Sequence, residues 1–277
     1  MNRQQKLSGV GAPREQGYQR MRDWLHERCG MIYPEKKKEL LIQRMQRVCE
    51  RYGVPGLEAL VDRVESGRDQ DMEFAVIHAA STNHTYFFRE PQVLNFFKDT
   101  ILPTLPQDGG RIWSAAASTG DEAYTLAIMA AETRGLDWAK RKLAILGTDI
   151  SEVVIAHAEA GIYGGSHIEQ MPGKLLERYF DPVGMDQYRV QDDLRQVCTF
   201  RRLNLKASPY PFQKAFHVVF CRNVLYYFDR AQQREIVDAI YDVTEPGGWL
   251  LTSVTVSLRE LGSRWIPIQS GVYRKAG

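Results

Sequence analysis

The sequence lacks long apolar runs and has few cysteines. No stretch of its 277 residues approaches the roughly 18 apolar residues of a membrane span, and the polar N-terminus has no apolar core of the signal-peptide kind. The cysteines show no CxxC spacing: Cys29, Cys49, Cys198 and Cys221. This pattern argues against a disulfide framework or a zinc site and favours free thiols in a reducing compartment. We therefore expect a soluble, cytoplasmic protein without a metal site.

Net charge is also nearly absent. The chain has 36 lysines and arginines against 34 aspartates and glutamates, which gives a formal net charge of +2. Overall charge therefore predicts no obligatory nucleic-acid or membrane partner. Hydrophobic residues make up 44% of the chain, and at this length they suffice for a sizeable core in one large domain or two smaller ones.

Glycine is scarce in the segment that most resembles a nucleotide-binding turn. Arg111–Ala127 predicts a buried strand, a tight turn and the start of a helix, which is typical of a cofactor cradle. Only Gly120 is a glycine there, so the GxGxxG pattern of NAD and FAD proteins is absent, although the alanines and Ser118 still permit close approach to a ligand. Thr119 and Glu122 have the spacing of a capping box. A ligand-binding role for them is the open alternative.

Hydrophobic periodicity divides the chain into a helical part and an α/β part. From Tyr18 to about Asn83 apolar residues recur at helical spacing, which predicts a small helical domain at 15–85. In the predicted domain 86–277, buried strands alternate with helices, as in a doubly wound sheet. Between 164 and 200 short candidate strands predict an antiparallel insertion: Leu175–Phe180, Gln187–Gln191 and Val197–Phe200. A further β-rich run is expected at Trp249–Val256.

The predicted helix Pro34–Tyr52 is unusually basic. Only Glu35, Glu39 and Glu50 stand against its cations, which are Lys36, Lys37, Lys38, Arg44, Arg47 and Arg51. Such a charge run is often a solvated helix face. Docking of an acidic partner is the alternative that the residues leave open.

Five blocks of sequence stand in a recognisable order along the chain. The central block is WSAAASTGDEAYTLA, and the others are STNHTYFFRE (Ser81–Glu90), GTDIS (Gly147–Ser151), RRLNL (Arg201–Leu205) and FCRNVLYYFD (Phe220–Asp229). Together they resemble the CheR family of chemotaxis receptor methyltransferases, which use S-adenosylmethionine (SAM) and whose central block reads WSAAASTGEEPYSLA. The resemblance implies an N-terminal helical bundle and a methyltransferase domain with a mostly parallel, seven-stranded sheet and an inserted β-subdomain.

The resemblance also implies the site residues. It implies catalytic roles for Arg89 and Tyr227. It implies contacts with SAM, and with the product S-adenosylhomocysteine (SAH), for Asn83, Thr85, Arg89, Glu122, Asp149, Asn204, Leu205, Asn223 and Val224. Asp149 has support from its position as well, because a carboxylate at the end of a parallel strand can accept hydrogen bonds from both ribose hydroxyls of a nucleoside. The alternative is an acidic residue favoured at a helix start.

The implied reaction is methyl transfer from SAM to glutamate side chains of bacterial chemoreceptors. A glutamate with a pKa near its usual value of about 4.3 is already ionised at neutral pH, so no general base is needed. Arg89 would then orient the carboxylate, and Tyr227 would steady the methyl group. By resemblance, the basic helix docks the receptor's helical cytoplasmic domain, and the β-subdomain is a candidate site for a receptor C-terminal peptide. We expect a monomer.

One segment departs from the family pattern. SVTVSL, at Ser253–Leu258, stands where many members read GHSESL. The change predicts a β-branched strand in place of a polar loop at the rim of the site. It keeps open an alternative function, that of a non-catalytic SAM-binding or docking protein in a signalling array.

Overall fold

The computed structural model describes residues 11–81, 85–254 and 257–277, which form two compact units. One unit contains the helices up to residue 81 together with Tyr227–Asp229, and the other contains residues 85–226, 230–254 and 257–277. Within these ranges, none of the helices combines the length and the apolar character that a bilayer crossing needs. The domain limits 15–85, 86–277 and 164–200 stay predictions.

The first unit is all helical, as predicted. Its helices are α1 (Gly11–Cys29), α2 (Lys38–Tyr52), α3 (Leu57–Glu65) and α4 (Gln70–Ala80), with a 3-10 turn at Glu35–Lys37. In α2, Leu41, Met45 and Val48 are buried at helical spacing, which is the stripe expected of a helix that packs on one face. The left-handed Gly53, at φ 63°, ends this helix.

Contacts within the unit occupy part of the basic face of α2. Lys38 is paired with Glu15 and also lies 3.6 Å from Glu35. Arg44 is part-buried and donates a hydrogen bond to the Ala80 carbonyl, at 2.8 Å. The excess of positive charge on segment 34–52 is therefore smaller than the sequence predicts, because two of its cations, Lys38 and Arg44, have partners inside the unit. Its exposed members are Lys36, Lys37, Arg47 and Arg51.

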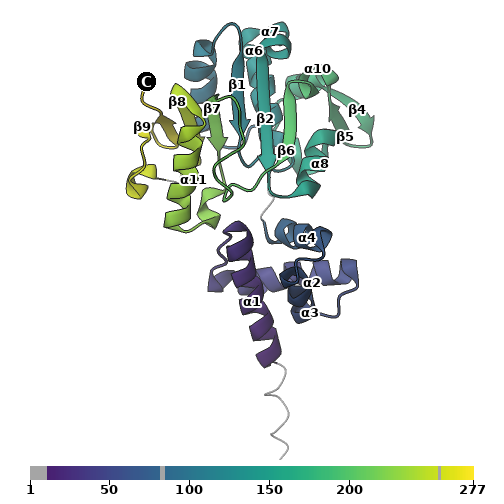
Figure 1. The fold of residues 1–277 in the computed structure, drawn as a ribbon. Helices are drawn as coiled ribbons and strands as arrows, with labels where there is room; N and C mark the ends of the chain where they lie inside the picture. The colour runs from purple at the N-terminus through teal and green to yellow at the C-terminus, as the bar shows by residue number, and fades with distance from the viewer. Residues whose placement is uncertain (1–10, 82–84, 255–256) are drawn as a thin grey trace, which may run out of the picture. The chain divides into compact units, whose positions relative to one another are not determined.

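The second unit is built on a seven-stranded sheet of order β6-β2-β1-β7-β8-β10-β9 (Figure 1). The strands are β1 (Gly110–Ser114), β2 (Leu143–Asp149), β6 (Cys198–Arg202), β7 (Phe216–Cys221), β8 (Thr244–Thr252), β9 (Ile266–Gln269) and β10 (Val272–Arg274). Strands from β6 to β8 pair in parallel, whereas β10 pairs antiparallel with both β8 and β9. The mostly parallel, doubly wound sheet is confirmed.

Helices cover both faces of this sheet. They are α5 (Pro91–Phe96), which continues as a π-helical turn (Phe97–Ile101) and a 3-10 turn (Leu102–Thr104), α6 (Asp121–Arg134), α7 (Leu136–Lys142), α8 (Glu152–Ala160) and α11 (Arg230–Asp242). In Figure 1, α11 lies in front of β7 and β8, and α6 and α7 lie behind the sheet. The core is tight between β2 and β6, because a Cβ at Gly147 would lie 2.6 Å from the Phe200 ring.

The predicted antiparallel insertion exists, but its elements differ from those predicted. A three-stranded sheet of order β3-β5-β4 is formed by β3 (Ile162–Gly164), β5 (Gln187–Val190) and β4 (Phe180–Gly184). The predicted strand Leu175–Phe180 is wrong: α9 (Gly173–Tyr179) occupies it, because Leu175, Leu176 and Tyr179 share one helical face on the core. The predicted strand Val197–Phe200 contributes to β6, which is a strand of the main sheet and not of the insertion. The short helix α10 (Asp192–Arg195) precedes β6 in the chain.

The β-rich run predicted at Trp249–Val256 is also shifted. Strand β8 begins earlier, at Thr244, and carries an irregularity where Pro246–Gly248 interrupts its register with β7. It ends at Thr252, so Ser253 and Val254 lie beyond the strand. Thr255 and Val256 lie outside the described residues. The β-branched composition therefore does not extend the strand through the described part of SVTVSL.

Candidate active site

The turn between β1 and α6 lies against the two neighbouring strands. The amide of Ala115 donates to the Phe220 carbonyl of β7, at 2.7 Å, and the amide of Ala117 donates to a carbonyl of β2, at 2.8 Å. Ser118 and Gly120 take left-handed φ values of 49° and 92°. A Cβ at Gly120 would lie 2.8 Å from a side-chain atom of α8. Both the backbone and the available space therefore require glycine at this position.

Asp149 stands at the carboxyl end of β2, beside this turn. Its Oδ2 accepts a hydrogen bond from the Ser118 amide and its Oδ1 accepts one from the Ser151 amide, each at 3.0 Å. Burial raises the pKa of the Asp149 carboxyl, and these amide bonds act against the rise. Because each carboxylate oxygen can accept more than one hydrogen bond, both retain capacity for hydroxyl donors of a ligand.

Of the two alternatives left open for Thr119 and Glu122, the capping box does not form. Helix α6 begins one residue later than that pattern requires, at Asp121, with Gly120 in the N-cap position and no side-chain cap. The Thr119 hydroxyl donates to the Asp121 carboxylate, at 2.6 Å. The Glu122 carboxylate turns away from the helix start and accepts a hydrogen bond from the Ser114 hydroxyl, at 2.7 Å. Glu122 therefore faces the end of β1.

Arg222, which directly follows β7, is the charged centre of the site. Its side chain is only 3% exposed. Nη1 donates to Glu122 Oε2 at 3.0 Å, and Nη2 donates to the Arg89 carbonyl at 2.5 Å and lies 3.4 Å from Glu90 Oε2. We call Arg222, Glu122 and Glu90 the charge cluster. The sequence prediction gave Arg222 no role, although an arginine directly after the apolar strand FHVVFC is a detectable signal.

Asn223 extends the charge cluster. Its side-chain amide donates to Glu90 Oε1, at 2.7 Å, and its backbone amide donates to the Ser253 hydroxyl, at 2.8 Å. Asn223 itself has a left-handed φ of 56°, a conformation that asparagine tolerates better than most residues. Ser253, the first residue of the segment SVTVSL that departs from the family pattern, therefore supports Asn223, which is a predicted site residue.

The segment after β6 brings two further predicted residues beside Asp149. The Leu203 amide donates to the Asp149 carbonyl, at 2.9 Å. The Asn204 side-chain oxygen accepts a hydrogen bond from the Lys206 amide, at 3.0 Å, and the Leu205 side chain is buried. Asp149, Asn204 and Leu205 thus form a second group at the same edge of the sheet.

The remaining predicted residues differ in how the structure places them. Thr85 is half-buried on the segment that leads to Arg89, and Val224 is half-buried directly after Asn223. Tyr227 ends a 3-10 turn and belongs to the helical unit. Asn83 lies outside the described residues.

A histidine, His167, contacts Asp121, the first residue of α6. His167 Nδ1 is 2.6 Å from the buried carboxylate of Asp121, and this contact raises the pKa of the His167 imidazole. The His167 carbonyl accepts a hydrogen bond from the Phe87 amide, at 3.0 Å. The ring of His157 lies 5.8 Å away and is nearly parallel, and burial lowers the pKa of His157. This cluster joins α6 to the segment that carries Arg89.

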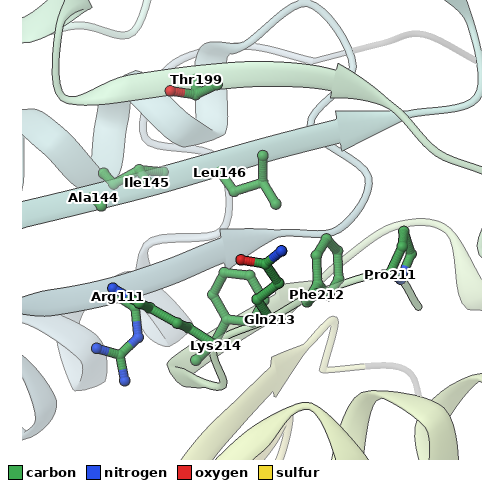
Figure 2. Close-up of a pocket in the computed structure, with 10 residues that line it drawn as sticks. Arg111, Ala144, Ile145, Leu146, Thr199, Pro211, Phe212, Gln213 and Lys214 are labelled. Atoms are coloured by element: carbon green, nitrogen blue, oxygen red, sulfur yellow. The ribbon is translucent and has the colours of Figure 1, made fainter. Parts of the chain in front are cut away.

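A separate pocket of about 360 Å³ lies on the sheet (Figure 2). It is lined by Arg111, Ala144, Ile145, Leu146, Thr199, Pro211, Phe212, Gln213, Lys214 and Phe216. Its strand residues come mainly from the amino-terminal halves of β1, β2, β6 and β7, and none is a predicted site residue. Ligands of doubly wound folds bind at the carboxyl ends of the strands, so this pocket is distinct from the candidate site.

The groups at the carboxyl ends fit a cofactor with a nucleoside and a cationic end. Asp149 offers acceptors for ribose hydroxyls, and the charge cluster has two carboxylates against one guanidinium, which leaves it net negative. The buried Ser118 hydroxyl, beside Asp149, has no hydrogen-bond partner among the residues described. Within the same ranges no group of three or more His, Cys, Asp or Glu could hold a metal ion.

The fold and this edge define a doubly wound, nucleoside-binding α/β domain joined to a helical domain. The chain belongs to the CheR methyltransferase family: the family's SAM binding domain matches residues 83–266, and its all-alpha domain matches residues 16–76. The predicted family and the predicted cofactor, SAM, are thereby confirmed.

Relatives and solved structures resemble the chain to different degrees. It is 33% identical to "Chemotaxis protein methyltransferase 1" of Pseudomonas aeruginosa, over 91% of this chain and 94% of that protein. It is 32% identical to "Chemotaxis protein methyltransferase" of Borreliella burgdorferi, over 83% and 84%. The glycopeptide N-methyltransferase MtfA complexed with SAH is 17% identical over 64% of this chain and 52% of that chain, with a TM-score of 0.38.

Proposed function

We propose that this protein transfers methyl groups from SAM to glutamate side chains of bacterial chemoreceptors. The observation that carries the proposal is the charge cluster, which joins the Arg89 backbone to Glu122 at the carboxyl ends of β1 and β7. Support also comes from the family match and from the names of the relatives, which are chemotaxis protein methyltransferases. The non-catalytic alternative is not favoured, because Ser253 still supports Asn223.

In this proposal the two groups at the sheet edge hold opposite ends of the cofactor. Asp149 accepts hydrogen bonds from the ribose hydroxyls, and Asn204 and Leu205 lie along the adenine. Glu122 accepts from the ammonium group of the amino-acid end, where its negative charge is complementary. Asn83, Thr85, Asn223 and Val224 complete the wall of the site.

The chemistry needs orientation and needs no proton transfer. SAM supplies a methyl group bound to a positively charged sulfur. A nucleophile attacks the methyl carbon, and the sulfur leaves as the neutral thioether of SAH. An ionised glutamate is already nucleophilic at neutral pH. Arg89 binds the cofactor and grips the substrate carboxylate, and Tyr227 offers a ring face or hydroxyl near the methyl group. Holding these groups in line lowers the entropic part of the barrier.

The partner surfaces follow from the helical unit and the small sheet. We propose that four exposed cations, on the 3-10 turn Glu35–Lys37 and on α2, dock the acidic helices of the receptor's cytoplasmic domain: Lys36, Lys37, Arg47 and Arg51. Arg44 is not part of this surface, because it holds the end of α4. The β3-β5-β4 sheet is the candidate site for a receptor C-terminal peptide. We propose that the protein acts as a monomer.

Transfer of labelled methyl groups from SAM to receptor-containing membranes tests the function. We expect incorporation into the receptors in a base-labile linkage, as carboxyl methyl esters require. Label in a base-stable linkage would indicate another acceptor group. SAH binding without any transfer would support the non-catalytic docking protein.

A further inference from the structure

The buried guanidinium of Arg222 connects two parts of the site that are far apart in sequence. We propose that Arg222 is a positioning residue, which fixes the Glu122 carboxylate and the Arg89 peptide in one arrangement so that cofactor and substrate carboxylate meet in line. This inference rests on the proposed function and extends it to a residue that is assigned no contact with either reactant.

The burial of the Arg222 side chain indicates that its contribution to the stability of the fold is not its main role. The side chain is 3% exposed, and its carboxylate partners Glu122 and Glu90 are 13% and 26% exposed. Removing charges from water is costly, and buried ion pairs often stabilise a fold no better than apolar residues of similar size. The apolar strand β7 precedes Arg222 directly, so an apolar residue could continue its packing. A buried charge that is dispensable for packing is more readily explained by the geometry that it imposes.

The charge balance of the cluster suits the cofactor. Two carboxylates and one guanidinium leave one net negative charge, and the amino-acid end of SAM, with its ammonium, sulfonium and carboxylate, carries one net positive charge. Without Arg222 the carboxylates of Glu122 and Glu90 would repel each other and separate. Arg222 therefore keeps both acceptors close together and keeps Glu122 directed toward the end of β1, where Ser114 holds its other oxygen.

The backbone contact acts on Arg89 itself. Phe88 and Glu90, on either side of Arg89, have left-handed φ values of 59° and 55°, and such conformations persist only where surrounding contacts enforce them. The Phe88 amide is held by the Thr125 hydroxyl, at 3.1 Å, and the Arg89 carbonyl is held by Arg222, at 2.5 Å. The bond from Arg222 thus fixes the peptide that sets the direction of the Arg89 side chain.

Two substitutions separate the charge of Arg222 from its geometry. Arg222→Met keeps a long side chain and removes both charge and donors. Arg222→Lys keeps the charge, but its single ammonium cannot reproduce the fork that reaches Glu122 and the Arg89 carbonyl together. Arg264→Met is the matched control: Arg264 also contacts two carboxylates and one carbonyl, those of Asp242 and Asp238, but lies outside the site.

Three measurements on the full chain test the proposal. SAH affinity by calorimetry should fall about tenfold or more in Arg222→Met and stay within about threefold of wild type in Arg222→Lys. Amide hydrogen exchange in the cofactor-free protein should speed up at residues 85–90 in both variants. In methyl transfer, Arg222→Lys should lower kcat about tenfold or more at saturating SAM. Arg264→Met should change none of the three.

The outcomes distinguish this inference from the proposed function. A lower melting temperature with unchanged SAH affinity and unchanged exchange at 85–90 would make Arg222 merely structural. Wild-type kcat in Arg222→Lys would overturn the positioning role as well, and this variant decides the question if Arg222→Met does not fold. If the wild type itself transfers no methyl groups to receptors, the proposed function fails, while affinity and exchange still report on what Arg222 holds in place.

Discussion

Replacing Asp149 by alanine gives the most direct test of the cofactor site. A carboxylate that accepts hydrogen bonds from two ribose hydroxyls contributes about 1.5–3 kcal/mol per bond, because the acceptor is charged. Burial, which raises the pKa of this carboxyl, also weakens screening by water. We therefore expect Asp149→Ala to lower the affinity for SAM and SAH by about 3 kcal/mol, a factor of roughly 150 in Kd.

The matched control for Asp149 is Glu152→Ala. Glu152 is the exposed first residue of α8, so it carries the same helix-start charge without the position at the strand end. A helix-start charge contributes only about 0.3–1 kcal/mol to stability and nothing to cofactor affinity. Titration of each variant with SAH, well below its melting temperature, separates the two explanations. If Asp149→Ala binds SAH within about threefold of wild type, as Glu152→Ala should, the ribose role is refuted.

Three further predictions concern docking, pH and the aromatic residue. The double variant Arg47→Glu with Arg51→Glu should slow receptor methylation several-fold at low salt while SAH affinity stays unchanged, and equal rates at all salt concentrations would support a solvated face. The contact with Asp121 raises the pKa of His167, so its stabilisation is present below the unfolded pKa and is lost as pH rises through the folded pKa. Melting temperatures of wild type and His167→Gln should therefore differ more at pH 6 than at pH 9, and a pH-independent difference would argue against this. Methylation rates should plateau near neutrality, and a climb toward pH 10 that disappears in Tyr227→Phe would make Tyr227 a titrating catalyst.

The pattern of apolar runs predicted the architecture because strands and helices differ in period. Asp149 was placed correctly at the end of β2 from its position after an apolar run. Leu175–Phe180 was predicted as a strand because its apolar residues are too few to define a period. Packing against the core stabilises a helix here, in which Leu175, Leu176 and Tyr179 lie on one face. Short segments of this kind depend on tertiary contacts that local sequence does not contain.

The contacts of Glu122 could not be predicted from the sequence for the same reason, because they depend on residues that are distant in the chain. Local spacing allowed a capping box with Thr119, which is a contact between near neighbours, and left a ligand role open. The observed partner Arg222 is 100 positions away in sequence, and it becomes a neighbour only because β1 and β7 pair in parallel with Ser114 opposite Phe220. Charge and burial could single out Arg222 as unusual, but only the strand order could supply its partner.

That strand order also explains why the charge cluster lies where it does. From β1 the chain winds through β2 to β6 on one side, and it then returns to β7 and β8 on the other side. The direction of winding therefore reverses between β1 and β7, which is the place where ligands of doubly wound sheets bind, at the carboxyl ends of the strands. Glu122 lies on α6, which follows β1, and Arg222 directly follows β7, so the ion pair between them joins the two halves of the sheet at this place. A single side chain after β7 is therefore able to hold a predicted cofactor contact that belongs to the opposite half of the fold.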